Sequence, residues 1–216
     1  MSSDKNSPFL LDKLGFLLAL LMGALILFLG HPMGFQMLGL MLFFLAISVF
    51  ATRYGSRSKK RLDIFEGERG WKNVMSNGLV PTLMVVSLFL TGDRIFLFAY
   101  IASIASITAD KFASELGIFD VPFFLLGMRR VRPGTSGAVS VLGTLASLSG
   151  AFIISLGSVY LFGFPIYTAF MLGLIGFMGG FVDSIFGILE EKGIGNKFTT
   201  NFMCSLTGAL MVWLVF

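Results

Sequence analysis

Seven runs of predominantly apolar residues, most of them about 20 residues long, follow one another along this chain of 216 residues. An α-helix crosses the roughly 30 Å hydrocarbon core of a bilayer in about 20 residues. Backbone groups surrounded by lipid must be satisfied within the segment, so such runs have to be helical. The sequence therefore predicts an all-α polytopic membrane protein with about seven transmembrane helices in one bundle, over 11–30, 33–52, 74–91, 95–114, 137–161, 165–189 and 198–216.

The composition agrees with this class and excludes several kinds of site. The chain is 56% hydrophobic and 13% charged, which is more apolar than a soluble domain of this size needs. Its 26 glycines suit closely packed membrane helices. The single Cys204 gives neither a disulfide framework nor a thiolate metal cluster, and the single His31 excludes a multi-histidine site. The net charge of +4 is a property of the loops, and we expect no nucleic-acid partner.

We interpret the chain as one integral membrane domain over 1–216. The first apolar run has a basic start, but a turn and another apolar run follow it where a signal peptide would be cleaved, so we expect a retained helix. Residues 1–52 are expected to form two peripheral helices and residues 65–215 a catalytic bundle.

The basic residues predict the orientation. With the amino terminus inside, Arg94 is the one basic residue of the outer segments, and the other fifteen of the sixteen fall inside. This asymmetry follows the positive-inside rule and places the carboxyl terminus outside. We expect a prokaryotic cell (inner) membrane. The inner set is Lys5, Lys13, Arg53, Arg57, Lys59, Lys60, Arg61, Arg69, Lys72, Lys111, Arg129, Arg130, Arg132, Lys192 and Lys197.

Asp183 lies in the middle of the sixth apolar run. A carboxylate at that depth costs roughly 3 kcal/mol on insertion scales and more in simulations, so a cation, a metal ion or a water-filled cavity must offset it. Asp110 occupies a similar position in the fourth run. Glu115 follows it, although it has the alternative of pairing with Lys111 at i, i+4. These carboxylates are the predicted functional residues.

Polar and small residues recur at helical spacing on five runs, near the predicted cytoplasmic ends. Such faces often serve only to pack membrane helices against one another. Because carboxylates lie on two of these faces, we expect the faces to converge on one functional pocket that opens to the cytoplasm. The faces carry Asn73 and Asn77; Ser103, Ser106 and Asp110; Ser136, Ser140, Thr144 and Ser147; Gly176, Gly180, Asp183, Gly187 and Glu190; and Asn201, Ser205 and Gly208.

The loop 129–137 joins three arginines to a Pro-Gly turn and then to Thr-Ser-Gly, which we expect to open a helix. Backbone N–H groups at a helix start attract anions, and hydroxyl and guanidinium groups add donors. The loop is thus predicted to cradle a phosphate, although it is not a Walker motif. The alternative is an ordinary helix start capped by Thr135 or Ser136. Carboxylates beside such a cradle favour phosphoryl or nucleotidyl chemistry with Mg²⁺.

Several segments together resemble one family. They are 69–81 (Arg-Gly-Trp-Lys-Asn-Val-Met-Ser-Asn-Gly-Leu-Val-Pro), 109–117, 133–144, 179–187 and 196–201. In this order they are similar to an integral membrane family that includes the plant phytyl-phosphate kinase. The resemblance covers roughly 65–215, and the family is more distantly similar to dolichol kinases and phosphatidate cytidylyltransferases. Lys111 departs from the small or hydroxyl residue expected after the aspartate, which leaves open whether it contacts a phosphate.

The resemblance implies an isoprenoid monophosphate kinase that uses a nucleoside triphosphate, with CTP as the expected donor, and Mg²⁺. We predict Asp110, Lys111, Glu115 and Asp183 as catalytic residues, with the three carboxylates as metal ligands. The predicted substrate- and nucleotide-binding residues are Asn73, Asn77, Arg129, Arg132, Gly134, Thr135, Ser136, Ser140, Thr144, Ser184, Asn196 and Asn201.

The expected partners are a prenyl monophosphate, the nucleotide and membrane lipids, and the sequence leaves a homodimer open. Two other functions stay open as well. One is CTP-dependent nucleotidyl transfer to a lipid, and the other is transport of a small polar or phosphorylated solute. The nearly bare outer side and the lack of paired broken helices in two related halves argue against transport.

Overall fold

The computed structural model describes residues 11–61, 70–124 and 129–216, apart from the side chains of Arg57, Ser58 and Arg61. Lys5 and Arg69, which belong to the predicted basic side, lie outside this description. The described residues form the α-helices α1 (Lys13–Leu29), α2 (Gly34–Arg53), α3 (Ser56–Arg61), α4 (Trp71–Thr91), α5 (Ile95–Leu116), α6 (Val141–Phe162), α7 (Ile166–Glu191) and α8 (Lys197–Met211), with 3₁₀ turns η1 (Gly117–Phe119) and η2 (Val212–Leu214).

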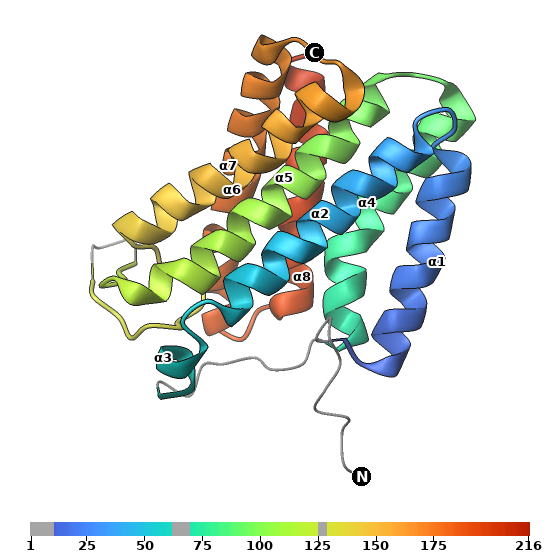
Figure 1. Ribbon diagram of the computed structural model, residues 1–216. Helices are drawn as coiled ribbons and strands as arrows, with labels where there is room; N and C mark the ends of the chain where they lie inside the picture. Colours follow the sequence, from blue (N-terminus) through green and yellow to red (C-terminus); the bar gives the residue numbers. More distant parts are fainter. Residues whose placement is uncertain (1–10, 62–69, 125–128) are drawn as a thin grey trace.

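The seven long helices alternate in direction, which confirms the predicted all-α polytopic fold. Figure 1 shows the start of α1 and the connections that follow α2, α5 and α7 at one end of the bundle. The tight connections that follow α1, α4 and α6 lie at the other end, together with the carboxyl terminus. Helices α2, α4, α5, α6 and α7 are long and apolar enough to cross a membrane, and α1 is a shorter apolar helix.

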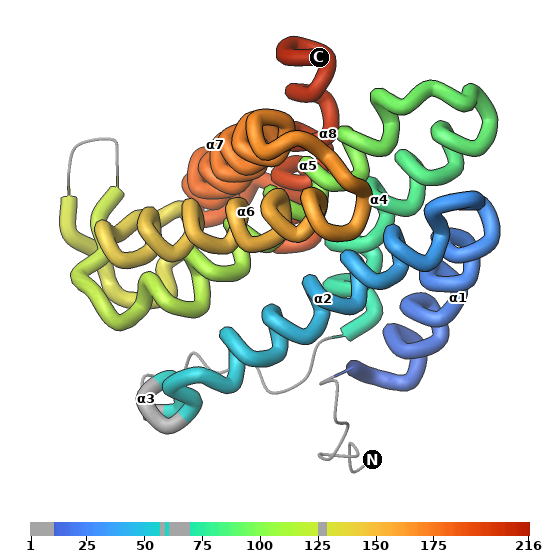
Figure 2. The backbone as a smooth tube through the Cα atoms, turned by 45° about the horizontal axis from the view of Figure 1, so that its top comes forward, coloured from blue at the N-terminus to red at the C-terminus, as the bar shows by residue number. Residues whose placement is uncertain are grey.

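Helix α5 is the centre of the bundle. It packs against α2, α4, α6, α7 and α8, and Figure 2 shows it surrounded by them. Its buried face is continuous from Leu97 to Ala109, and Ile101, Ile104 and Tyr100 are fully buried. Small residues let the neighbouring helices approach closely, as expected where lipid supplies no hydrophobic drive between helices. The interior beside α5 is therefore solid for most of its length.

The two amino-terminal helices lie against this centre from one side. Helix α1 packs on α4 at the edge of the molecule, and α2 crosses the bundle in contact with α5 and α6 (Figure 1). The Tyr100 hydroxyl donates a 2.6 Å hydrogen bond to the carbonyl oxygen of Met37, which ties α5 to α2 where no water can replace the bond.

Two boundaries differ from the prediction for local reasons. The fifth long helix begins at Val141 rather than at Gly137, because Ser140 is the cap: its Oγ accepts from the Gly143 N–H at 3.0 Å. Gly134 and Gly137 have φ angles of 89° and 73°, which no helix start accommodates. The last helix ends at Met211 and closes in η2, so it is shorter than the predicted 198–216.

Candidate functional site

A cavity of about 400 Å³ lies at the end of the bundle that carries the long connections, between α5, α6, α7, α8 and the loop before α6. Eleven of the predicted site residues line it: Asp110, Lys111, Glu115, Gly134, Thr135, Ser136, Ser140, Thr144, Asp183, Ser184 and Asn201. Five predicted residues do not: Asn73, Asn77, Arg129, Arg132 and Asn196. Residues more than 90 positions apart in the sequence thus converge on one space, as the polar faces predicted.

The deepest polar feature of the cavity is a pair of carboxyl groups. The side chains of Asp110 on α5 and Asp183 on α7 lie within hydrogen-bonding contact of each other. Within the part of the chain that the structure describes, the buried Oδ1 atom of Asp183 has no hydrogen-bond partner. Two carboxylates at this separation repel each other unless a proton or a cation lies between them. The pair therefore needs either a shared proton or a cation between its two carboxyl groups.

Glycines on α7 explain how the two aspartates meet. A Cβ atom at Gly180 would lie 2.7 Å from that of Ala109, and one at Gly176 would clash with Ala105. One turn beyond Gly180, the same face of α7 carries Asp183 and then Gly187. The predicted small-residue face is therefore the contact surface between α7 and α5, and it sets Asp183 beside Asp110.

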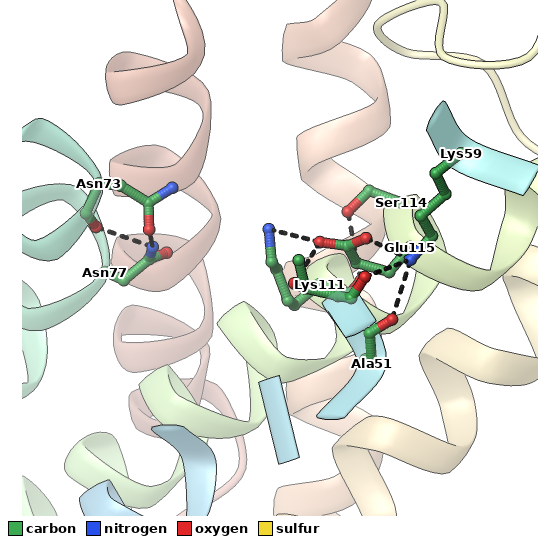
Figure 3. Close-up of polar contacts among 8 residues, drawn as sticks. Ala51, Lys59, Asn73, Asn77, Lys111, Ser114 and Glu115 are labelled. Atoms are coloured by element: carbon green, nitrogen blue, oxygen red, sulfur yellow. Dashed lines mark hydrogen bonds and ion pairs between the residues drawn. The ribbon is translucent and has the colours of Figure 1, made fainter. Parts of the chain in front are cut away.

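Glu115 differs from the prediction. Its Oε1 atom accepts a hydrogen bond from the Thr52 hydroxyl at 2.6 Å and lies 3.1 Å from Lys111 Nζ, while Oε2 lies 2.7 Å from Lys59 Nζ (Figure 3). The pairing with Lys111 that the sequence left open is confirmed. Among the described residues, no group of three or more Asp, Glu, His or Cys side chains could hold a metal ion. Both oxygens of Glu115 are thus engaged by Lys59, Lys111 and Thr52, which sets this carboxylate apart from the aspartate pair.

Lys59 belongs to the basic set that the sequence places on the inner side of the membrane, yet it is 2% exposed. Its ammonium group donates to the carbonyl oxygens of Ala51 at 2.9 Å and Thr52 at 3.1 Å, as well as to Glu115 (Figure 3). Three protons and three acceptors satisfy it completely. Lys59 therefore fastens α3 and the end of α2 to α5. The periodicity of the sequence does not predict the burial of Lys59, because that burial depends on α3 folding back beneath α2.

Lys197 lies at the cavity, although the sequence analysis did not predict it as a site residue. It begins α8 and lines the cavity, and its charge acts on both Asp110 and Asp183. Its position directly after Asn196, in a segment that the resemblance includes, was the available signal. Ser114, Ser147 and Thr200 line the same cavity. The site thus brings a cation to two acidic groups from a third helix.

The loop before α6 forms one wall of the cavity, but not as a helix start. The Ser136 N–H donates to Glu191 Oε1 at 2.9 Å, and the Thr135 hydroxyl donates to the Arg132 carbonyl oxygen at 2.8 Å. Gly137 packs directly on Gly187 of α7, where neither position has room for a side chain. The prediction that Thr135 and Ser136 open or cap a helix is wrong. The loop is instead held by α7, with its arginines 129 and 132 exposed.

The start of α6 is held separately, by Asp120. Its carboxylate accepts hydrogen bonds from the N–H groups of Leu142 at 3.0 Å and Val121 at 2.7 Å, which hold the pKa of Asp120 below its ordinary value. Ser140 also donates to the Gly117 carbonyl oxygen at 3.0 Å, and Thr144 donates to that of Ser140 at 2.9 Å. Ser140 and Thr144 therefore shape the wall of the cavity as well as line it.

The predicted asparagines gather around a second cavity, of about 650 Å³. Asn73 and Asn196 line it, and Asn201 and Lys197 line both cavities. Asn77 Nδ2 donates to Asn73 Oδ1 at 3.0 Å (Figure 3). Asn196 caps α8 by accepting from the N–H groups of Phe198 and Thr199. The two cavities thus share Lys197 and Asn201 at the start of α8.

Two relatives of this chain come from an archaeon and a plant. An uncharacterized membrane protein of Methanocaldococcus jannaschii is 37% identical over 213 residues, covering 95% of this chain and 86% of that protein. Protein PGR of Arabidopsis thaliana is 27% identical over 198 residues, covering 76% and 68%. No solved structure matches the chain significantly. The family model described as integral membrane protein DUF92 matches residues 7–208, so the chain belongs to this family of integral membrane proteins.

Proposed function

We propose that this protein is a membrane-embedded isoprenoid monophosphate kinase. It transfers the terminal phosphoryl group of a nucleoside triphosphate, with CTP as the expected donor, to a phytyl or other prenyl monophosphate. The observation that carries the proposal is the Asp110–Asp183 pair, with its unpartnered Oδ1 atom and Lys197 nearby, at the base of a cavity. The family resemblance of residues 65–215 supplies the substrate class.

The residues fit a magnesium ion. Mg²⁺ in phosphoryl-transfer sites is usually held by one or two carboxylates, with substrate phosphates and water completing its shell. Asp110 and Asp183 would hold it, and Asp183 Oδ1 is the buried oxygen without another partner. When bound there, the ion would neutralise charge on the transferred phosphoryl group.

The lysines and the loop would position the phosphates. Lys111 and Lys197 line the cavity beside the aspartates, so their ammonium groups balance the charge of the triphosphate and of the acceptor. An oxygen of the prenyl monophosphate attacks the terminal phosphorus in line, and the bond from that phosphorus to the bridging oxygen breaks. The products are the prenyl diphosphate and the nucleoside diphosphate. The attacking oxygen is already ionised at neutral pH, so the reaction needs no general base.

The apolar part of the cavity suits the lipid tail. Phe177 and Phe181 on α7 line it, and so does Thr144 on α6, which is exposed. A tail that leaves the cavity between α6 and α7 would enter the surrounding lipid, where burial contributes about 0.8 kcal/mol per CH₂ group. Only the phosphate then needs polar contacts.

The solid interior above the cavity argues against transport. Ile104, Ile101 and Tyr100 on α5, with Leu172 on α7, are fully buried between the cavity and the far end. A solute crossing the bundle would have to displace this packing. The accessible polar groups, which lie at one end of the bundle, therefore favour an enzymatic reaction in the cavity over transport of a solute through the bundle.

The test is an assay of purified protein in detergent, with Mg²⁺, prenyl monophosphates of several lengths and nucleoside triphosphates labelled either at the terminal or at the α-phosphate. A kinase puts the terminal label into a prenyl diphosphate, and EDTA abolishes the product. Incorporation of the α-label would instead identify nucleotidyl transfer. Absence of product with every pair of substrates would contradict the proposal and favour a transporter, which shows no net flux without compartments.

A further inference from the structure

The second cavity lies between the starts of α4 and α8 and has the side chains of a nucleoside site. Two aromatic rings, Trp71 and Phe198, line it, together with the amides of Asn73 and Asn196. Trp71 is 41% exposed, although it stands at the first position of a membrane helix. Aromatic rings in an open groove are stacking partners for nucleobases, whatever the base. Amide groups add hydrogen bonds to a base edge.

The Asn73 amide is oriented for such a role. Its Oδ1 atom accepts from Asn77 Nδ2 at 3.0 Å, and Asn77 also donates to the Asn73 carbonyl oxygen at 2.8 Å. Figure 3 shows the Nδ2 group of Asn73 directed away from Asn77. The pair therefore presents a fixed donor, which matches a carbonyl oxygen or an unprotonated ring nitrogen of a base.

Asp12 stabilises the part of the second cavity that Trp71 lines. Its Oδ1 atom accepts from the Gly15 N–H at 2.6 Å, and its Oδ2 atom accepts from the Trp71 N–H at 3.2 Å. The carboxylate thus fixes the start of α4 to the start of α1. Asp12 thus holds Trp71 in place from the start of α1, so α1 contributes to the structure of the groove.

The second cavity is connected to the aspartates by shared residues. Lys197 and Asn201 line both cavities, and the charge of Lys197 acts on Asp110 and Asp183. A molecule with an aromatic ring at one end and phosphates at the other could occupy both cavities. A prenyl phosphate lacks such a ring, whereas a nucleoside triphosphate has one.

We propose that the groove of Trp71, Asn73, Asn196 and Phe198 binds the base and ribose of the nucleotide, while its phosphates pass Lys197 and Asn201 to reach the aspartates. This assignment rests on the proposed kinase function and says which cavity takes which substrate. The donor enters beside α4 and α8, and the lipid enters between α6 and α7. The two substrates therefore reach the aspartates from different sides.

The first test measures binding without turnover. The chain has two tryptophans, so Trp213→Phe leaves Trp71 as the single reporter. CTP or ATP should quench the Trp71 fluorescence saturably, because the base covers the ring. Inorganic tripolyphosphate, which has no base, should bind in competition but leave the fluorescence nearly unchanged. Quenching by tripolyphosphate equal to that by CTP, or no quenching by either nucleotide, would overturn the assignment.

The second test uses steady-state kinetics. Trp71→Ala should raise KM for the nucleotide about tenfold, the low end of base–aromatic stacking, with KM for the prenyl phosphate unchanged. Trp71→Phe keeps a ring and should restore most of the affinity. Trp213→Ala, in η2 at the far end of the bundle, is the matched control and should leave KM unchanged.

The outcomes separate the two proposals. An active kinase in which Trp71→Ala leaves the nucleotide KM unchanged would disprove the nucleoside groove and leave the proposed function standing. Specific quenching by nucleotides, together with no prenyl diphosphate from any substrate pair, would disprove the kinase and leave a nucleotide site.

Discussion

The carboxyl group of Asp110 on α5 lies within hydrogen-bonding contact of that of Asp183 on α7, and Asp183 keeps one buried oxygen without a partner. In a membrane helix each of these groups alone is unfavourable, and together they repel. The structure thus places two acidic groups where a proton or a cation between them would relieve their repulsion. The following predictions test this relationship and the contacts that support it.

Asp183→Asn keeps the shape of the side chain and removes its charge. Activity in the prenyl phosphate assay should fall at least about a hundredfold, which corresponds to roughly 2.7 kcal/mol in the barrier. The thermal midpoint in detergent should stay the same or rise, because a buried carboxylate is gone.

Asp93→Asn is the matched control for that substitution. Asp93 lies in the turn at the opposite end, and its Oδ1 atom accepts from the Ile95 N–H at 2.9 Å, which an asparagine oxygen also does. It should retain full activity. Near-full turnover of Asp183→Asn would show that the aspartate pair is not the metal site.

Gly180→Ala tests the approach of α7 to α5. The new methyl group would lie 2.7 Å from Ala109 Cβ and 3.2 Å from the Asp110 nitrogen, so the helices must separate. We expect a loss of roughly 1–3 kcal/mol in stability and a fall in activity as Asp183 moves from Asp110. Gly39→Ala on α2, with no atom within 4 Å of its new methyl group, should change neither. Thermal unfolding and the product assay measure both variants, and an unaffected Gly180→Ala would show that the close approach is dispensable.

Lys59→Met tests the buried ion pair. Removing the ammonium leaves Glu115, which is 13% exposed, with one lysine fewer, and it breaks the ties to Ala51 and Thr52. Breaking a buried pair from one side costs roughly 3–5 kcal/mol. Lys60→Met, at the neighbouring exposed position, should cost far less.

A double variant separates the pair from the packing around it. If Lys59 acts mainly through Glu115, Lys59→Met should cost less stability in a Glu115→Gln background than in the wild-type chain. Glu115→Gln carries a cost of its own, because it leaves Lys111 without its anionic partner. Equal stability of Lys59→Met and Lys60→Met would show that the pair contributes nothing.

Membrane orientation is the fourth prediction. In a background with Cys204→Ser, a cysteine at Lys60 should resist an impermeant thiol reagent added to intact cells, since the basic connections are expected inside. A cysteine at Asp93, in the turn at the other end, should react. Labelling of position 60 in intact cells would reverse the topology and place the aspartate cavity outside.

Much of the architecture could be predicted from local sequence properties. Runs near the thickness of a bilayer predict the seven long helices, and a carboxylate inside such a run, as at Asp183, marks the cavity. Gly176, Gly180 and Gly187 lie on one face by simple periodicity, and this face is indeed the contact with α5 and the loop. The predicted start of the fifth long helix at Gly137 was wrong, because Ser140 is the cap and the helix begins at Val141.

The sequence by itself determined which segments enter the membrane, because hydropathy and backbone satisfaction act within each segment. It also determined which faces are polar. Only the tertiary structure decided which charges meet. Glu115 could pair with Lys111 alone, join the aspartates or bind Lys59, and the fold of α3 beneath α2 selected the lysines. Likewise Lys197 lines the cavity of the two aspartates only because the tertiary structure brings the start of α8 to α5 and α7. Which charged side chains pair depends on the distances between helices, and the spacing of residues along one helix does not give those distances.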